Sequence, residues 1–369
     1  MTRRVFLHIG LPKTGTTFLQ DSLWSNKAAL TKAGLLLPGV HKRRHLLASL
    51  DIREDPSLAR RSGDVSAPWR DLVSESLAWR GDILISHEFF CAASAEQVRR
   101  VVDDVGYAEL HVIVTARAMV DLGISRWQEW VRNGGTQDID RFPVRSDYDP
   151  TDEWGWGSCD LADVLGRWAT AVPAPRIHIL PMAPGRGHAE ELAHRFASVL
   201  GIEPRLMASE RAEANRSLGV VETELLRRVN PHLTEFRSAG DRGRWIRSYL
   251  AMPDVLPTSG ERFRPGPETL AELTRRGEQA TAMLRTGGFD VVGDLELMTP
   301  SDVTQLRHPS EVTEEEMLAV SVEVIANLMG KVRTVTRSRN ELATVLESQR
   351  PRVSVARIVR AIRSRLMGV

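Results

Sequence analysis

Residues 5–17 read Val5-Phe6-Leu7-His8-Ile9-Gly10-Leu11-Pro12-Lys13-Thr14-Gly15-Thr16-Thr17. The first five form a compact apolar run, broken only by His8, that ends at Gly10. This pattern is typical of a buried parallel strand that leads into a glycine-rich turn. A helix is expected from about Thr16, because apolar residues recur at helical spacing after it. The segment therefore predicts a strand, a tight loop and a helix in direct succession.

The loop between this strand and this helix has the chemistry of an anion site. Gly10 and Gly15 let the backbone turn tightly and approach a ligand closely. Backbone amides at the start of a helix point outward, and the helix dipole favours negative charge there. Lys13 adds a mobile positive charge, and Thr16 and Thr17 add hydroxyl donors. We therefore expect this loop to hold an anion such as a phosphate.

The glycine spacing of the loop matches the Walker A pattern G-x-x-x-x-G-K-[ST], but the lysine does not. Thr16 follows the second glycine, where Walker A loops have lysine, and Lys13 lies inside the loop. An ordinary ATPase or kinase needs that lysine on the β- and γ-phosphates and a hydroxyl on Mg²⁺. The departure argues against those enzymes.

Strand and helix patterns alternate over the first 200 residues. Strands are predicted at 82–86, 110–115 and 176–180, and helices at 95–105, 120–131 and 188–200. Alternation of this kind implies an α/β fold with three layers, in which helices cover both faces of a parallel sheet. Residues 38–68 are interpreted as loop and short helix. In residues 41–45 we expect a solvated basic loop; the alternative is that His41 or His45 approaches a bound substrate.

Beyond residue 215 the strand signals fade and helical patterns follow. Helices are predicted at 219–229, 268–284 and 314–347. The α/β domain is expected to span 1–300, and a helical C-terminal extension with a basic tail is expected at 301–369. We expect the 314–347 helix to pack on its own domain or to pair with a second copy, and the tail to be a solvated helix or a peripheral membrane contact.

The composition limits the functional classes. The 369 residues carry 49 basic and 48 acidic side chains, a formal net charge of +1. This balance gives no global drive toward nucleic acid or an anionic membrane. Cys91 and Cys159 are the two cysteines, which excludes a disulfide framework and a metal-binding cysteine cluster and fits a reducing cytoplasm. The N-terminal apolar run is too short for a signal peptide, and no stretch approaches the length of a membrane span.

The loop also resembles a known family. Pro12-Lys13-Thr14-Gly15-Thr16-Thr17 is similar to the P-K-[ST]-G-[ST]-[ST] loop of sulfotransferases that use 3′-phosphoadenosine 5′-phosphosulfate (PAPS). The resemblance implies that Pro12, Lys13, Thr14, Gly15, Thr16 and Thr17 bind the 5′-phosphosulfate. It also implies that Lys13 assists the leaving phosphate and that no metal is needed.

A second signature of this family is an arginine at the end of a strand with a serine eight positions later. Arg117 follows the strand predicted at 110–115, and Ser125 lies eight residues on. The resemblance implies that both bind the 3′-phosphate of PAPS. A guanidinium offers two parallel hydrogen bonds to a phosphate, and a hydroxyl adds another. Met119 stands where the family usually has proline, a position that shapes the turn and does not contact phosphate.

The general base is expected just after the strand predicted at 82–86. Glu88 is the first candidate and His87 the second, because members of the family use either residue type and both lie at the carboxyl edge of the sheet. A strand alternates its faces, so only one of them points into the site. In the alternative interpretation, Glu88 caps the following turn and His87 packs under a loop.

Arg216 is a further candidate for nucleotide binding. The segment Asn215-Arg216-Ser217-Leu218-Gly219 resembles the part of bacterial sulfotransferases that closes over the nucleotide, although the R-K-G motif of the family is not evident. The alternative is a helix start capped by Ser217.

The sequence thus predicts a PAPS-dependent sulfotransferase acting on a hydroxyl or amine, carried by a carbohydrate, a lipid or a small molecule. Two alternatives stay open. One is a nucleotide kinase or other P-loop NTPase, and the other is a non-catalytic nucleotide-binding scaffold that assembles through its C-terminal helices.

Overall fold

The computed structural model describes residues 3–61, 63, 66–142, 153–182, 188–208 and 217–349. Its centre is a six-stranded sheet in the order β2-β3-β1-β4-β5-β6, and all neighbouring strands are parallel. The strands are β1 (Arg4–His8), β2 (Leu35–Leu36), β3 (Asp82–Ser86), β4 (Glu109–Ala116), β5 (Ile177–Pro181) and β6 (Asp290–Val291). The predicted α/β fold is confirmed.

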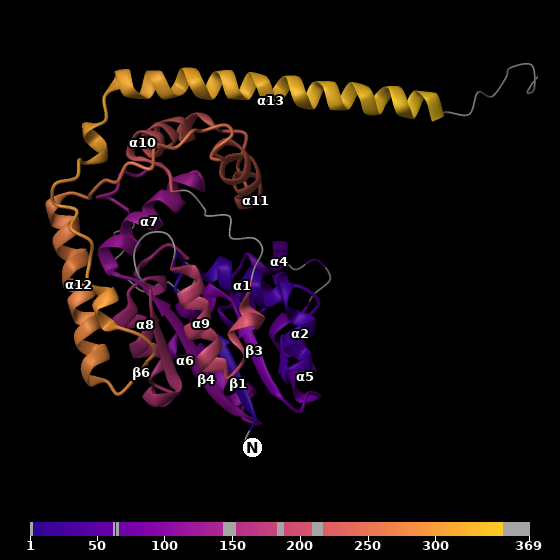
Figure 1. Cartoon of the computed structure of the whole chain (residues 1–369), viewed down its shortest axis with the longest axis vertical. Coiled ribbons are helices and arrows are strands. Elements are labelled where there is room, and N and C mark those ends of the chain that lie inside the picture. The colour runs from indigo at the N-terminus through magenta and orange to yellow at the C-terminus, as the bar shows by residue number, and fades with distance from the viewer. Residues whose placement is uncertain are drawn as a thin grey trace, which may run out of the picture.

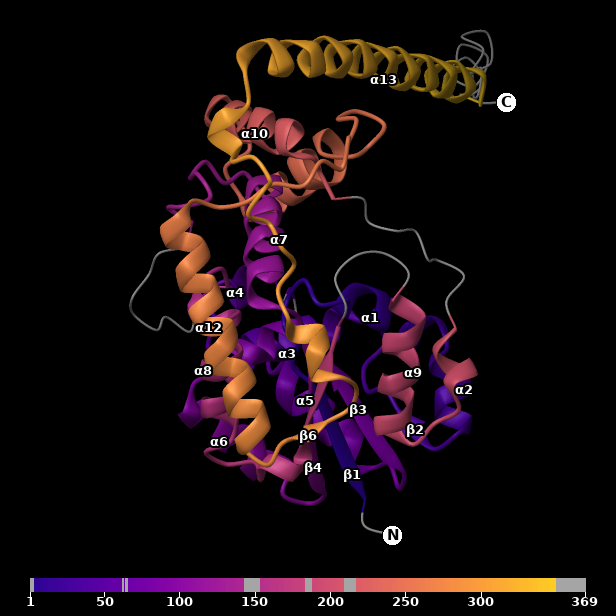
Figure 2. The ribbon, with the colours of Figure 1, turned by 60° about the vertical axis from the view of Figure 1, so that its left-hand side comes forward.

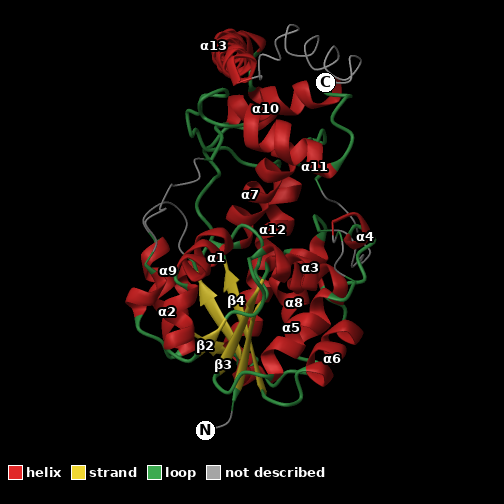
Figure 3. Cartoon of the chain, turned by 90° about the vertical axis from the view of Figure 1, so that its right-hand side faces the viewer, coloured by secondary structure: helices red, strands yellow, loops and turns green. Residues whose placement is uncertain are grey.

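The helices of the chain cover both faces of this sheet or lie beyond its carboxyl edge, as Figure 3 shows. They are α1 (Thr16–Ser25), α2 (Lys27–Lys32), α3 (Arg43–Ile52), α4 (Leu58–Arg61), α5 (Pro68–Leu77), α6 (Ala95–Asp104), α7 (Met119–Arg132), α8 (Leu161–Trp168), α9 (Ala189–Leu200), α10 (Val220–Val229), α11 (Ala239–Asp241), α12 (Pro267–Thr286) and α13 (Glu314–Gln349). Successive side chains of a strand point to opposite faces of the sheet, so each strand packs against the helices on both sides. Phe6 of β1 packs in the core with α1 and α9, whereas its neighbours Val5 and Leu7 pack in the core with α6, α8 and α12.

A third apolar core lies beyond the carboxyl edge of the sheet. α7 leads away from that edge, and its far half packs with α10 and with the start of α13 (Figure 2). Trp127 and Val131 of α7, Leu226 of α10 and Met317 of α13 are all buried there. α13 lies across the top of this layer and runs on past it (Figure 1). Within the described ranges, no helix is both long enough and apolar enough to span a membrane.

Several features differ from the sequence-based expectations, and the helices α2, α5 and α8 lie where no element was predicted. The edge strands β2 and β6 were not predicted, since two residues are too few to show a periodic pattern. Residues 41–45 are not a solvated loop throughout, because α3 begins at Arg43 and His45 is fully buried. His45 Nε2 lies 2.8 Å from Pro38 O, and its Nδ1 accepts a hydrogen bond from Ser86 N at 3.1 Å. Burial lowers the pKa of His45 to about 4, so this side chain is a neutral core residue.

Candidate functional site

The loop that joins β1 to α1 is built on two glycines with left-handed backbone. Gly10 has φ 106° and Gly15 has φ 82°. Space is short at both positions. A Cβ on Gly10 would lie 3.1 Å from Glu88, and a Cβ on Gly15 would lie 2.8 Å from Leu192 Cδ2. Any other residue at these positions would be strained in conformation and crowded by neighbours.

A row of buried polar side chains crosses three strands beneath this loop. His8 of β1 lies with Nδ1 2.8 Å from Ser86 Oγ of β3 and with Nε2 3.5 Å from Thr115 Oγ1 of β4. Thr115 donates to Gly10 O at 3.0 Å, and its oxygen lies 2.6 Å from Thr14 Oγ1. Burial lowers the pKa of His8 to about 4, so the row is uncharged at neutral pH. These hydrogen bonds hold the loop against the ends of the strands. The hydroxyl of Thr14 bonds within the protein, so it does not face a ligand.

The start of α1 leaves its amides open. Gly15 is the N-cap residue and offers no side chain, and the first turn has no acidic residue. The first amides of a helix have no partner within the helix. Thr16 is buried and Thr17 is exposed, while Pro12 and Lys13 are half-buried. Uncapped amides beside a lysine are suited to an anion.

Lys13 is held by a carboxylate of α7. Its Nζ lies 3.0 Å from Glu129 Oε2, and Arg247 Nε of the π-helix Arg242–Leu250 lies 2.7 Å from Glu129 Oε1. Arg132 contributes a longer ion pair at 3.9 Å. Burial alone raises the pKa of Glu129, but the three cations outweigh it and lower this pKa to about 2. Glu129 is therefore a buried anion surrounded by positive charge.

Arg117 lies at the other end of α7 and is held far more loosely. Its Nη2 is 4.0 Å from Asp121 Oδ1, and its Nε has no hydrogen-bond partner within the described ranges. Asp121 also meets Arg262 at 3.9 Å and accepts a hydrogen bond from Ser301 N at 3.0 Å. Burial lowers the pKa of Arg117, and the charge of Asp121 opposes this effect. An under-satisfied guanidinium has hydrogen bonds left to donate.

One stripe of α7 connects these two groups. Asp121, Ser125 and Glu129 follow at intervals of four residues and so lie on the same face of the helix. Arg117 meets the first of them, and Lys13 meets the last. β1 and β4 are neighbouring parallel strands, so the loop after β1 and the arginine after β4 share one edge of the sheet. Ser125 lies between them, and its hydroxyl has no hydrogen-bond partner in the described part of the chain.

The two base candidates point in different directions. Glu88 adjoins Gly10, and its Oε2 accepts a hydrogen bond from Gln20 Nε2 of α1 at 3.0 Å. Burial raises its pKa, but His87, the backbone amide of Glu88 and Gln20 outweigh burial and leave the pKa lowered, so the group is ionised. His87 faces α3, with Nδ1 3.2 Å from Ser49 Oγ, and accepts the Phe89 amide as a cap. Glu88 is the candidate that lies beside the loop, and His87, not Glu88, caps the turn.

Arg216 falls outside the described residues. Glu129 and Arg247 were not predicted, although the four-residue spacing from Asp121 to Glu129 was available as a signal. Within the described ranges, no group of three or more histidine, cysteine or acidic side chains is arranged to hold a metal ion.

Comparisons with known proteins leave the family open. No family model matches the chain, and no curated protein matches it. Among solved structures, the chain is similar to the crystal structure of a sulfotransferase from Alicyclobacillus acidocaldarius, with 16% sequence identity and a TM-score of 0.36. The match covers 67% of this chain and 96% of that chain. A superposition this loose carries no argument about activity, so functional inference rests on the residues of this chain.

Proposed function

We propose that this protein is a sulfotransferase that uses PAPS as its donor and a hydroxyl or amine as its acceptor. The observation that carries the proposal is that Lys13 and Arg117, far apart in sequence, meet the two ends of one stripe of α7. Lys13 is paired there with the carboxylate of Glu129, and Arg117 with that of Asp121. Two anionic groups of one ligand would compete with these carboxylates for the two cations. The uncapped amides at the start of α1 follow Lys13 directly in the chain, and Arg117 Nε has no hydrogen-bond partner among the described residues.

The residues fit the two anionic ends of this donor. The amides at the start of α1 and Lys13 would hold the phosphosulfate, and Thr17 is exposed near them. Arg117 and the hydroxyl of Ser125 would hold the 3′-phosphate. The donor supplies an activated sulfuryl group, and all other groups needed for transfer belong to the chain.

Charge and proton transfer follow from this arrangement. The acceptor atom forms a bond to sulfur while the bond from sulfur to the bridging oxygen of the phosphate breaks. Lys13 leaves Glu129 and places its positive charge at that oxygen, where negative charge develops. Glu88 is ionised and beside the loop, so it accepts the proton that the acceptor loses. Glu129 stays paired with Arg132 and Arg247 when Lys13 departs.

A binding experiment tests the donor. Adenosine 3′,5′-bisphosphate, the product left by PAPS, should bind in calorimetry and raise the melting temperature without Mg²⁺. Tighter binding of ATP that depends on Mg²⁺ would favour the NTPase alternative. Turnover is tested by incubating extract fractions with ³⁵S-labelled PAPS and identifying the product by mass. Bisphosphate binding with no labelled product from any fraction would favour the scaffold alternative.

A further inference from the structure

α13 is anchored to the body along one face. Met317 is buried, and Val320 and Val324 pack in the core shared with α10. Asn327 Nδ2 donates to Val255 O at 3.1 Å, and Lys331 Nζ lies 2.6 Å from Asp254 Oδ2. These contacts fix the rotation of the helix, so its other face is turned away from the body.

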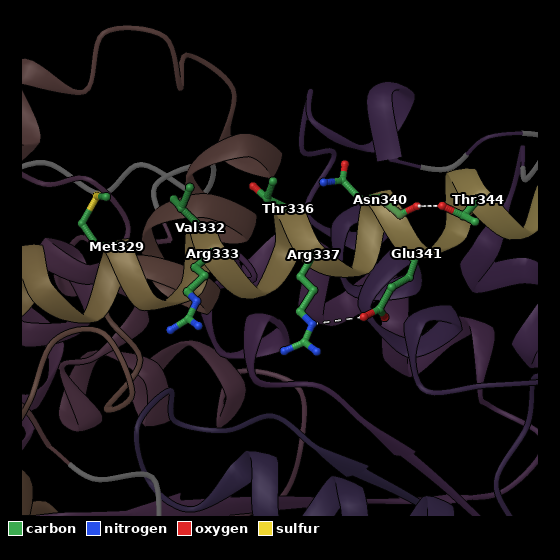
Figure 4. Close-up of a pocket in the computed structure, with 8 residues that line it drawn as sticks. All are labelled: Met329, Val332, Arg333, Thr336, Arg337, Asn340, Glu341 and Thr344. Atoms are coloured by element: carbon green, nitrogen blue, oxygen red, sulfur yellow. Dashed lines mark hydrogen bonds and ion pairs between the residues drawn. The ribbon is translucent and has the colours of Figure 1, made fainter.

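That other face carries an apolar line, which we call the outer seam. It consists of Leu318, Val322, Ile325, Met329 and Val332, whose exposed fractions are 65%, 60%, 61%, 64% and 54%. The spacing alternates between four and three residues, the repeat of two helices that wind around each other. In Figure 4, Met329, Val332 and Thr336 project from the same edge of α13. Within the described ranges, nothing in the chain covers this seam.

The charges of α13 divide at the middle of the seam. Residues 314–326 contain four glutamates and no lysine or arginine. Residues 327–340 contain one lysine and three arginines and no acidic residue. Two such helices attract each other when antiparallel, since each acidic half then lies along a basic half. In a parallel pair, like charges would lie along like charges.

We propose that two copies of this chain pair through their outer seams, antiparallel, about a two-fold axis near residue 327. This register places Val322 against Val332 of the second copy and Ile325 against its Met329, which gives four apolar layers. Leu318 lies against Thr336 of the second copy in the layer at each end. At each end Glu315 faces the other copy's Arg339. The anchored face lies on the far side of α13 from the seam, so the two bodies stay apart. The pairing stands whether or not the protein is a sulfotransferase.

Charge disfavours two other occupants of the seam. Residues 350–369 carry six arginines and no acidic residue, so they would be repelled by the basic half of α13 that precedes them. An anionic membrane would repel the acidic half, which holds three of the five seam residues. A second copy satisfies both halves at once.

The first test is the mass of the full chain in solution. Sedimentation and light scattering should give twice the chain mass of 41.2 kDa. Ile325→Glu should raise the dissociation constant of the pair at least about 100-fold, because each pair would then bury two unpaired carboxylates. Thr334 is exposed on the opposite side of α13. Thr334→Glu is therefore the matched control and should leave the dissociation constant unchanged.

Cysteine pairs test the register, since both native cysteines are buried. The double variant Val322→Cys with Val332→Cys should form a disulfide-linked dimer under mild oxidation, and Val322→Cys alone should not. Crosslinking of the single variant would mean a parallel pair and would overturn the proposal. Glu315→Arg should weaken the pair, and adding Arg339→Glu should restore it.

Three further outcomes would overturn the proposal. One is a monomeric mass at all concentrations up to about 100 μM, which is a thousandfold above the dissociation constant of about 0.1 μM that we expect for a stable pair. Another is a chain ending at residue 349 that dimerises when the full chain does not, because the tail would then be the occupant. The last is a monomer that sediments with phosphatidylserine vesicles and loses this binding in Ile325→Glu.

Discussion

The two ends of the α7 stripe hold their cations in different ways. At the Glu129 end, Lys13 shares a buried carboxylate with two arginines, and its contact is 3.0 Å long. At the Asp121 end, the contact of Arg117 is 4.0 Å long and its Nε has no hydrogen-bond partner in the part of the chain that the structure describes. The comparison suggests a division of labour. A loosely held arginine is ready to bind a ligand, whereas a tightly held lysine has to be released before it acts.

Loss of Lys13 should have the largest effect. Lys13→Ala should lower kcat at least about 1,000-fold, because no other charge is expected at the bridging oxygen in the transition state. Bisphosphate affinity should change much less. Lys42→Ala removes an exposed lysine paired with Asp21 and serves as the control. A kcat within tenfold of the native value would remove Lys13 from the chemistry.

Glu129→Gln should change how the free energy of unfolding depends on pH in acid solution. The pKa of Glu129 is lowered to about 2 in the folded chain, from 4.5, so its stabilising effect is complete above pH 4.5 and is lost as pH falls toward 2. Such a shift corresponds to roughly 3 kcal/mol. Urea unfolding between pH 5 and pH 2.5 should therefore show a shallower loss of stability in the variant. If the free energy of unfolding falls equally with pH in the variant and the native protein, Glu129 is not the strongly paired group.

Arg117→Ala should act mainly on binding. A charged hydrogen bond to phosphate is worth about 1.5–3 kcal/mol, so the Kd for adenosine 3′,5′-bisphosphate should rise roughly 10- to 100-fold. The kcat at saturating donor should stay close to native. Arg262→Ala removes the other arginine at Asp121 and controls for the loss of that pair. Unchanged affinity in Arg117→Ala would refute its assignment.

Ser125→Ala should give the smallest effect. A single hydroxyl that donates to a charged phosphate contributes about 1.5 kcal/mol, so bisphosphate affinity should fall roughly tenfold. Ser125→Thr keeps the hydroxyl and should bind like the native chain. Equal losses in both variants would point to helix packing as the cause.

The parts of the site that the sequence predicted are those encoded in short segments. The loop from Gly10 to Thr17 and the spacing of Arg117 to Ser125 are local patterns, and the alternation of strands and helices implies one shared edge for them. Glu129 and Arg247 were missed because the contacts of Glu129 with Lys13 and with Arg247 each join segments more than 100 residues apart. The directions of Glu88 and His87 depend on Gln20 and Ser49, which no strand pattern reveals.

The stripe of α7 also keeps its two ends a fixed distance apart. Asp121 and Glu129 are eight residues apart, which is about 12 Å along a helix axis that rises 1.5 Å per residue. A rigid helix keeps this span whatever occupies its ends. For the proposed donor, this fixed length would be a basis for choosing among nucleotides. A molecule with both anionic groups at one end would reach a single cation, and one with groups on either side of its sugar would reach both.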